Sequence, residues 1–474
     1  MLITVTLGNF RRKPFTVRAK MRRKWNPQLS IFHTMATHEI AKELAAISEV
    51  LDDNPRVVEL AYKDLVGIIS SDTGREGMSA EQVLRCAIVK QHRTMSYEEL
   101  AFHLEDSHSF RAFTRLKMGQ YPSASTLQEN ITALKPTTWE TIHEAVTRYA
   151  ASEKLEKGRK VRLDSTTVES NIHYPTDSRL LQDGIRIITR LMVEGKRLRP
   201  KPGYRFSDHR RVAKKRVMTI VNAKRKKVRQ QAYRDLLGVA ERVRGYGLEA
   251  IEVLEVFTSE EAEQIIRARA LRGKLERALM IFIRVIDQTE RRVIHGESVP
   301  ASEKVVSFFE THTDIIVKGG RETQYGHKVF LTGGSTGLIL DCLVVRGNPK
   351  DSSMFSQMIE RQQVLYNRVP RQVAADGGFA SQDNLSWAKG EGIKDVMFCK
   401  KKGLSVLDMV KSHWVYKRLR NFRAGIEGNI SRLKRAFALA RCTWRGWIGF
   451  QQYVWSTIVS YNLSVLGRLK MATT

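Results

Sequence analysis

The sequence predicts an α/β fold in which an all-helical region precedes a domain built around a sheet. Short stretches rich in β-branched residues recur after residue 158, and a long helical block separates the first from the others. A chain of 474 residues is long enough for two or three domains. We expect a basic extension over 1–35, a helical domain over 36–150 and an α/β domain over 158–474, with a helical insertion at about 180–300.

The 36–150 region carries repeated signals for helix starts. A Ser followed three residues later by Gln or Glu is typical of a capping box. Three such pairs occur: Ser79 with Gln82, Ser96 with Glu99, and Ser125 with Gln128. Short helices with tight connections are typical of a helix-turn-helix-like DNA-binding domain, although a generic helical bundle shows the same pattern.

The α/β domain is predicted from a series of separate elements. The expected strands cover residues 160–168, 326–331, 338–345, 372–376 and 394–398. The expected helices cover 178–293, with one long helix opened by Thr258, then 353–366 and 417–469.

The charge of the chain indicates a polyanionic partner. The net charge is +30 and the isoelectric point is near 10.1, which favours nucleic acid. Residues 196–245 alone hold eighteen Lys or Arg against three Asp or Glu, a net charge of +15. A membrane surface is the rival partner, but no amphipathic basic helix of the interfacial type stands out. No apolar run approaches the roughly 20 residues of a membrane span. We therefore expect double-stranded DNA, and no membrane.

Cysteine usage and the N-terminus predict a protein of the cytoplasm. The four cysteines lie far apart and form no pattern typical of zinc binding or of a disulfide framework. The basic N-terminus lacks the apolar core of a signal peptide. Met21 is an alternative start of translation, which would remove the first twenty residues.

One acidic residue stands out in a basic helix near the C-terminus. Glu427 is the only acid between residues 411 and 445, a stretch with ten Lys or Arg. Helical spacing places Arg420, Arg423 and Lys434 on the same face as Glu427. Glu427 is therefore either the ion-pair partner of Arg423 or a metal ligand in a site that holds a polyanion.

Two further acids occupy strand positions. Asp164 lies within the first expected strand, and Asp376 ends the strand at 372–376 before two glycines. Taken alone, Asp164 is also consistent with a local hydrogen-bonding cluster, and Asp376 is also consistent with a turn. Together with Glu427, they supply hard oxygen ligands for Mg²⁺ or Mn²⁺, and two such ions act on phosphodiesters in many enzymes.

The chain resembles the DDE transposases of bacterial insertion sequences over about residues 75–465. The similarity rests on Leu163–Ser178, on Tyr325–Phe330, on Val373–Ala380, and on the spacing Arg-x3-Glu-x6-Lys, supplied by Arg423, Glu427 and Lys434. The family often has Tyr three residues before that Arg, where this chain has Arg420.

The resemblance implies an RNase H-like catalytic core whose catalytic and metal-binding residues are Asp164, Asp376 and Glu427. It also implies DNA contacts by basic residues of the same helix: Arg420, Arg423, Lys434 and Arg435. The expected reaction is cleavage at terminal inverted repeats and strand transfer into target DNA, by at least a homodimer, on DNA of the nucleoid. Two alternatives stay open: a metal-dependent nuclease without strand transfer, and a DNA-binding regulator derived from a transposase.

Several other residues have weaker claims to a role. Asp341 and Asp351 are alternatives to Asp376, with Asp351 expected to cap the following helix. For two pairs of residues and two tryptophans, a structural role is at least as well supported as a functional one. They are His327 with Lys328, His173 with Tyr174, Trp444 and Trp447.

Overall fold

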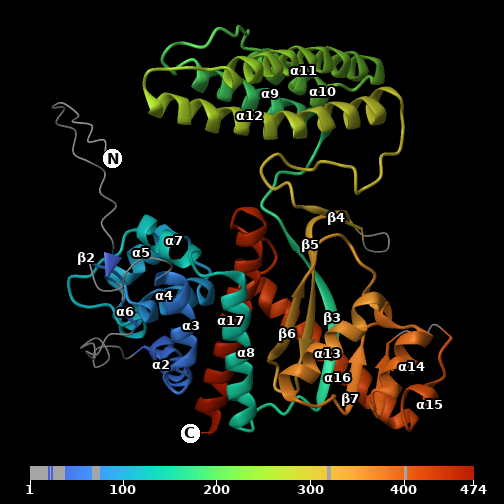
Figure 1. The fold of residues 1–474 in the computed structure, drawn as a ribbon. Coiled ribbons are helices and arrows are strands. Elements are labelled where there is room, and N and C mark those ends of the chain that lie inside the picture. Colours follow the sequence, from blue (N-terminus) through green and yellow to red (C-terminus); the bar gives the residue numbers. More distant parts are fainter. Residues whose placement is uncertain are drawn as a thin grey trace, which may run out of the picture. The chain divides into compact units, whose positions relative to one another are not determined.

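The chain forms two compact units in a computed structural model, and the positions of its parts relative to one another are not determined (Figure 1). The structure describes residues 20, 21, 23, 24, 38–66, 75–317, 322–399 and 403–473. Most of the expected extension over 1–35 lies outside these residues. The first unit comprises residues 1–157 and 455–474, and the second comprises 158–454. The first unit therefore includes the end of the chain, which the sequence analysis assigned to the α/β domain.

The first unit is helical apart from a two-residue strand pair, β1 Lys20–Met21 with β2 Arg75–Glu76. Its helices are α2 Glu39–Asp52, α3 Arg56–Val66, α4 Ala80–His92, α5 Tyr97–Asp106, α6 His108–Thr114, α7 Ala124–Thr132 and α8 Pro136–Ser152. Residues from 455 onward in α17 Gly446–Thr473 complete the unit.

Two of the three expected capping boxes are confirmed. Ser79 caps α4 and Ser96 caps α5, each exchanging hydrogen bonds with the residue three positions on. The third is wrong, because α7 begins at Ala124 and its cap is Ser123, whose hydroxyl accepts from the Thr126 amide at 3.3 Å. A serine two residues earlier satisfies the same free amides, so Ser125 lies inside the first turn.

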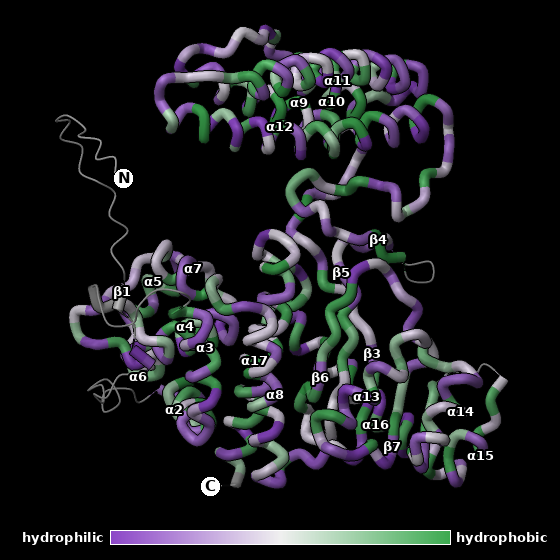
Figure 2. The backbone as a smooth tube through the Cα atoms, viewed as in Figure 1, coloured by the Kyte–Doolittle hydropathy of each residue, from purple (hydrophilic) through white to green (hydrophobic). Residues whose placement is uncertain are grey.

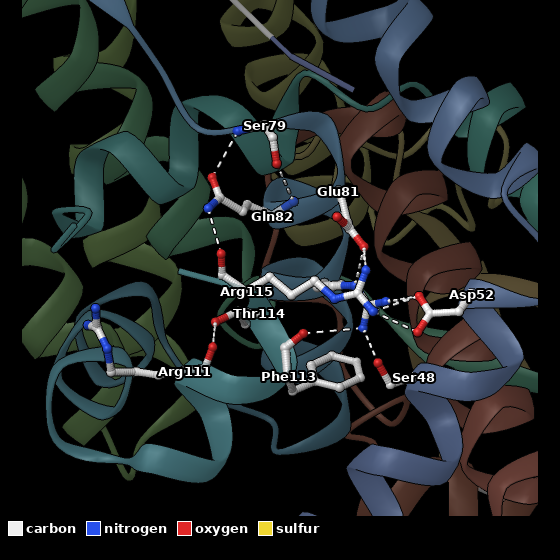
Figure 3. Close-up of polar contacts among 10 residues, drawn as sticks. Ser48, Asp52, Ser79, Glu81, Gln82, Arg111, Phe113, Thr114 and Arg115 are labelled. Atoms are coloured by element: carbon white, nitrogen blue, oxygen red, sulfur yellow. Dashed lines mark hydrogen bonds and ion pairs between the residues drawn. The ribbon is translucent and has the colours of Figure 1, made fainter. Parts of the chain in front are cut away.

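A buried ionic network holds α4 within this unit (Figure 3). The side chain of Arg85 is 1% exposed and donates to Asp52 at 2.7 Å and to Glu81 at 3.0 Å. It also donates to the Ser48 hydroxyl at 2.7 Å. Arg115 contacts the same two carboxylates, with 2.6 Å to Asp52 and 2.5 Å to Glu81. Two arginines thus compensate the charge of the buried Glu81, which would otherwise be costly to desolvate.

The second unit contains a mixed six-stranded sheet (Figure 1). Its strands are β3 Lys160–Glu169, β4 Asp314–Ile316, β5 Gln324–Gly333, β6 Ile339–Val344, β7 Gln372–Ala375 and β8 Asp395–Phe398. β3 is central, with β5 antiparallel on one side and β7 parallel on the other. β8 continues the parallel side, while β4 and β6 both pair with β5 in antiparallel fashion.

Several helices of this unit pack on the sheet. They are α13 Phe355–Tyr366, α14 Gln382–Gly390, α15 Val406–Met409 and α16 His413–Ala436. α16 contacts β3, β7 and β8, and its buried residues include Leu419, Ile426 and Leu433, seven positions apart. This spacing gives α16 one apolar face toward the sheet and leaves its other side for polar groups. Sequence analysis missed β4, α14 and α15, which are too short to show a clear period.

The expected helical insertion is present after β3. It consists of α9 Asp177–Gly195, α10 Arg210–Asn222, α11 Lys226–Glu255, α12 Ala262–Thr289 and a π-helical turn, Glu290–Ile294. Green and purple alternate along these helices in Figure 2, as expected of helices with one buried face. They enclose a hydrophobic core of their own that includes Ile185, Leu236 and Phe282. The predicted start at Thr258 is wrong by a turn, since α12 begins at Ala262.

Half of the net positive charge of the chain lies in this insertion, between residues 196 and 245. Of the eighteen Lys or Arg between residues 196 and 245, fifteen are exposed. Such a density of like charge is unfavourable unless an anionic partner or salt neutralises it. Within the residues that the structure describes, no helix combines the length and the apolar character that crossing a membrane requires.

Candidate active site

Strand pairing brings the two aspartates together. β3 and β7 are parallel neighbours whose register places Leu163 opposite Ala375. The next residue on each strand path is an aspartate, Asp164 within β3 and Asp376 immediately after β7. Asp164 and Asp376 are separated by 212 positions in the sequence (376 − 164). They nevertheless lie side by side at the end of the β3–β7 pairing.

The third acid reaches the same place from α16. Ile426 is fully buried beneath the helix, and Glu427 follows it with 63% of its side chain exposed. Asp164, Asp376 and Glu427 all line one cleft of about 1120 Å³. The other lining residues are Ser165, Thr166, Thr167, Glu322, Gln324, Lys328, Lys350, Asp351, Ser352, Gly378, Arg423, Ile430, Ser431 and Lys434. The cleft therefore holds the three acids among several cationic side chains.

Arg423 bridges the three acids. Its guanidinium donates to Asp164 at 2.8 Å and lies 3.2 Å from Asp376, and its other terminal nitrogen donates to Glu427. Burial alone would lower the pKa of Arg423, but the charges of Asp164 and Asp376 raise it above its ordinary value. The ion pair considered from the sequence is therefore present, and it extends beyond Glu427 to both aspartates.

The donor set suits a hard divalent cation. Three carboxylates provide the oxygen ligands that Mg²⁺ and Mn²⁺ prefer. Among the residues described, no group of three or more acidic, His or Cys side chains has the arrangement of a metal site. A cationic guanidinium lies between the carboxylates instead, where it offsets part of their negative charge. Metal binding at these residues would thus require Arg423 to leave its present position.

Asp351 is a fourth acid of the cleft, which sequence analysis underrated. It accepts from Lys328 Nζ at 2.9 Å and from the Ser165 hydroxyl at 3.3 Å. The expected role as a helix cap is wrong, because Asp351 is the first residue of the 3₁₀ turn Asp351–Met354 and its side chain caps nothing. It also requires a glycine beside it, since a Cβ on Gly378 would lie 2.4 Å from Asp351 Oδ2. No local sequence signal connects Asp351 with Ser165.

The basic residues predicted to contact DNA divide into two groups. Arg423 and Lys434 line the cleft. Arg420 and Arg435 are exposed on α16 and lie outside the described lining of the cleft. Arg435 donates to the Ser431 hydroxyl at 2.9 Å. Of the four predicted DNA contacts, Arg423 and Lys434 are therefore the two that share the cleft with the three acids.

The structural interpretation holds for His327, Trp444 and Trp447. His327 is fully buried in a chain of hydrogen bonds, 2.8 Å from Asp314 and 2.7 Å from His312. Trp447 stacks on Phe450 and Trp444 is buried against Tyr453. These side chains support the fold rather than the cleft.

Two family models match the chain. One described as a transposase DDE domain matches residues 283–463, and one described as a transposase domain (DUF772) matches residues 36–133. The first match includes Asp376 and Glu427 but begins after Asp164. No curated protein and no solved structure matches the chain.

Proposed function

Because the chain belongs to the DDE transposases of insertion-sequence type, we propose that it cleaves DNA at terminal inverted repeats and joins the ends to a target. The observation that carries this proposal is the convergence of Asp164, Asp376 and Glu427 in one cleft. Transposases of this class generally depend on divalent metal ions and act on DNA. The net charge of +30 supports a DNA substrate.

The sheet supports an RNase H-like assignment for the core. A central strand bears the first acid, an antiparallel strand lies on one side, and a parallel strand ending in the second acid lies on the other. The helix that carries the third acid packs on the same strands. The helical insertion between the first and second strands accounts for the long separation of Asp164 from Asp376.

We assign Asp164, Asp376 and Glu427 as the ligands of Mg²⁺ or Mn²⁺, with two ions as the expected number. Such ions activate an attacking oxygen and stabilise a leaving oxygen on a phosphodiester. If the carboxylates bound a metal ion, the Arg423 guanidinium would be free to pair with a DNA phosphate, as arginine does bidentately. Lys434, on the same side of α16 and in the same cleft, provides a second phosphate contact.

The remaining DNA contacts are assigned to surfaces outside the cleft. Arg420 and Arg435 are exposed on α16 and would contact the backbone of the DNA that leaves the cleft. The helical domain over 36–150 and the basic insertion would bind the inverted repeats. Pairing two DNA ends requires at least a homodimer, which acts in the cytoplasm where the DNA lies.

The decisive experiment measures metal-dependent cleavage of a duplex carrying the repeat that flanks the gene. Glu427→Gln keeps the shape of the side chain and removes its charge. We expect DNA binding to persist and cleavage to fall by about a thousandfold or more, since a metal ligand contributes several kcal/mol to the transition state. Glu391→Gln, at an exposed position beyond α14, is the matched control and should cleave normally.

The two alternatives give different outcomes in the same assay. Joined products on a circular target support a transposase, whereas cleavage without joining indicates a nuclease. Salt-sensitive binding without any cleavage by the wild-type protein indicates a regulator. Equal cleavage by the wild-type protein and Glu427→Gln would remove Glu427 from the site and leave it as an ion-pair partner of Arg423.

A further inference from the structure

A second, smaller pocket adjoins the cleft. Its volume is about 260 Å³, and it lies where the end of β3 meets the start of β5. It is lined by Glu169, Ser170, Ile172, His173, Tyr174, Glu322, Thr323, Gln324, Tyr325 and Arg441. Glu322 and Gln324 line the large cleft as well, so a ligand in the cleft has direct access to this pocket.

Aromatic and hydrogen-bonding groups are combined in its walls. Tyr174 is 65% exposed, and its ring lies edge-on to that of Tyr325, with centroids 5.5 Å apart. Arg441 is held by a hydrogen bond to the Ile172 carbonyl. An exposed tyrosine beside a fixed arginine provides a surface on which a planar group can stack.

Ser170 contributes to the wall of the pocket, although its hydroxyl is enclosed by the protein and does not open into the pocket. Its side chain is 98% buried, since the residue is 2% exposed, and its hydroxyl has no hydrogen-bond partner among the described residues. Its amide is already engaged, donating to the Tyr325 carbonyl at 2.9 Å. Buried hydroxyls without a partner are rare because desolvation costs free energy that no hydrogen bond returns.

The charges of the pocket disfavour a phosphate. Two carboxylates, Glu169 and Glu322, face only one cation, Arg441, among the described lining residues. Carboxylates accept from the exocyclic amino groups of bases, as they do from cytosine in DNA grooves. A flat group with an amino donor, linked to a phosphate chain in the neighbouring cleft, satisfies all of these features.

We propose that this pocket binds one amino-bearing nucleobase of the DNA that enters the cleft, stacked on Tyr174 and held by Glu169 and Glu322. The inference rests on the proposed function. Ser170 lies six positions after Asp164, just beyond the end of β3, which corresponds to about 20 Å at roughly 3.3 Å per residue. The base therefore belongs to a nucleotide several positions from the phosphate at the three acids, and it must leave the stack to enter the pocket.

The test is a scan of single abasic sites along each strand of the flanking-repeat duplex. Binding is measured for the wild type, Tyr174→Ala and Tyr174→Phe, with the last retaining the aromatic ring. We expect one position at which the abasic site weakens wild-type binding by about 5- to 150-fold, the range for one base–aromatic stack. Tyr174→Ala should bind the intact duplex as weakly and lose its sensitivity at that position, whereas Tyr174→Phe should behave as the wild type does.

The amino group is tested by placing thymine, which lacks one, at the sensitive position. Wild-type binding should weaken, and Glu322→Gln should discriminate less between the two duplexes. The proposal is overturned if no position is sensitive, if Tyr174→Ala remains as sensitive as the wild type, or if thymine is bound equally well. Failure of the wild type to bind the repeat at all would instead contradict the proposed function.

Discussion

The Arg423 guanidinium donates to the Asp164 carboxylate at 2.8 Å and so joins α16 to the central strand of the sheet. The two residues are 259 positions apart. The same guanidinium reaches Asp376 and Glu427, so one cation lies among three acids and reduces the repulsion between them. Arg423 thus stabilises the cleft when no other cation is bound.

Replacement of Arg423 should strengthen metal binding. In Arg423→Gln a metal ion no longer has to displace the guanidinium from the carboxylates. That displacement breaks hydrogen bonds between charged groups, each of which contributes roughly 1.5–3 kcal/mol. We expect calorimetric Mn²⁺ affinity to rise by about tenfold or more. Arg420→Gln removes the same charge from the exposed part of α16 and should leave affinity nearly unchanged. Weaker binding by Arg423→Gln would show that Arg423 does not compete with the metal.

Loss of Asp351 should destabilise the second unit. The Lys328 side chain is 8% exposed and its nearest carboxylate is Asp351 at 2.9 Å. Asp351→Asn leaves that ammonium buried without its counter-charge, at a cost of about 3–5 kcal/mol. The free energy of unfolding in urea should fall by that amount, and Lys328→Met in the same protein should restore part of it. Asp383→Asn, exposed at the start of α14, provides a control that should change little.

Replacement of Arg85 should lower the stability of the first unit to a similar extent. Arg85→Met removes hydrogen bonds to the side chains of Asp52, Glu81 and Ser48 and to the Phe113 carbonyl. Breaking a buried ionic network of this kind costs about 3–5 kcal/mol, which urea denaturation would detect. Arg148→Met, on the exposed side of α8, should stay within about 0.5 kcal/mol of the wild type. A small effect of Arg85→Met would mean that Arg115 alone compensates Glu81.

Ionised Glu43 should make the free energy of unfolding depend on pH in the acidic range. A hydrogen bond from His92, opposed by burial and assisted by Ser464, lowers the pKa of Glu43 to about 2. The unfolded chain then binds more protons than the folded one at pH values between about 4.5 and 2. The contribution of Glu43 is therefore complete above pH 4.5 and is lost as the pH falls through this window.

Thermal denaturation of Glu43→Gln beside the wild type would measure this contribution. The difference in midpoint should be largest near neutral pH and should shrink toward pH 2–3. Glu49→Gln, exposed on the same helix, is a matched comparison and should show a smaller pH dependence. A midpoint difference that stays constant with pH would contradict the assignment to ionised Glu43.

Local patterns predicted much of the fold because they act over a few residues. Alternating and β-branched stretches gave β3 and β5–β8, and the boundary serines gave the starts of α4 and α5. Errors occurred where two local signals compete, as at Ser123 and Ser125, and where elements are too short for a period, as in β4, α14 and α15. The helical period correctly placed Arg423 beside Glu427.

The sequence by itself determined the charge of the chain, predicted the family that two family models support, and singled out the three acids as candidates, because motif spacing and composition require no knowledge of packing. Only the tertiary structure decided what surrounds those acids. Strand register placed Asp376 next to Asp164, and the chain path brought Asp351 to Ser165 across 186 positions. The pocket around Ser170 and Tyr174 likewise depends on β3 meeting β5. Contacts between residues distant in the chain arise from packing, which no local pattern encodes.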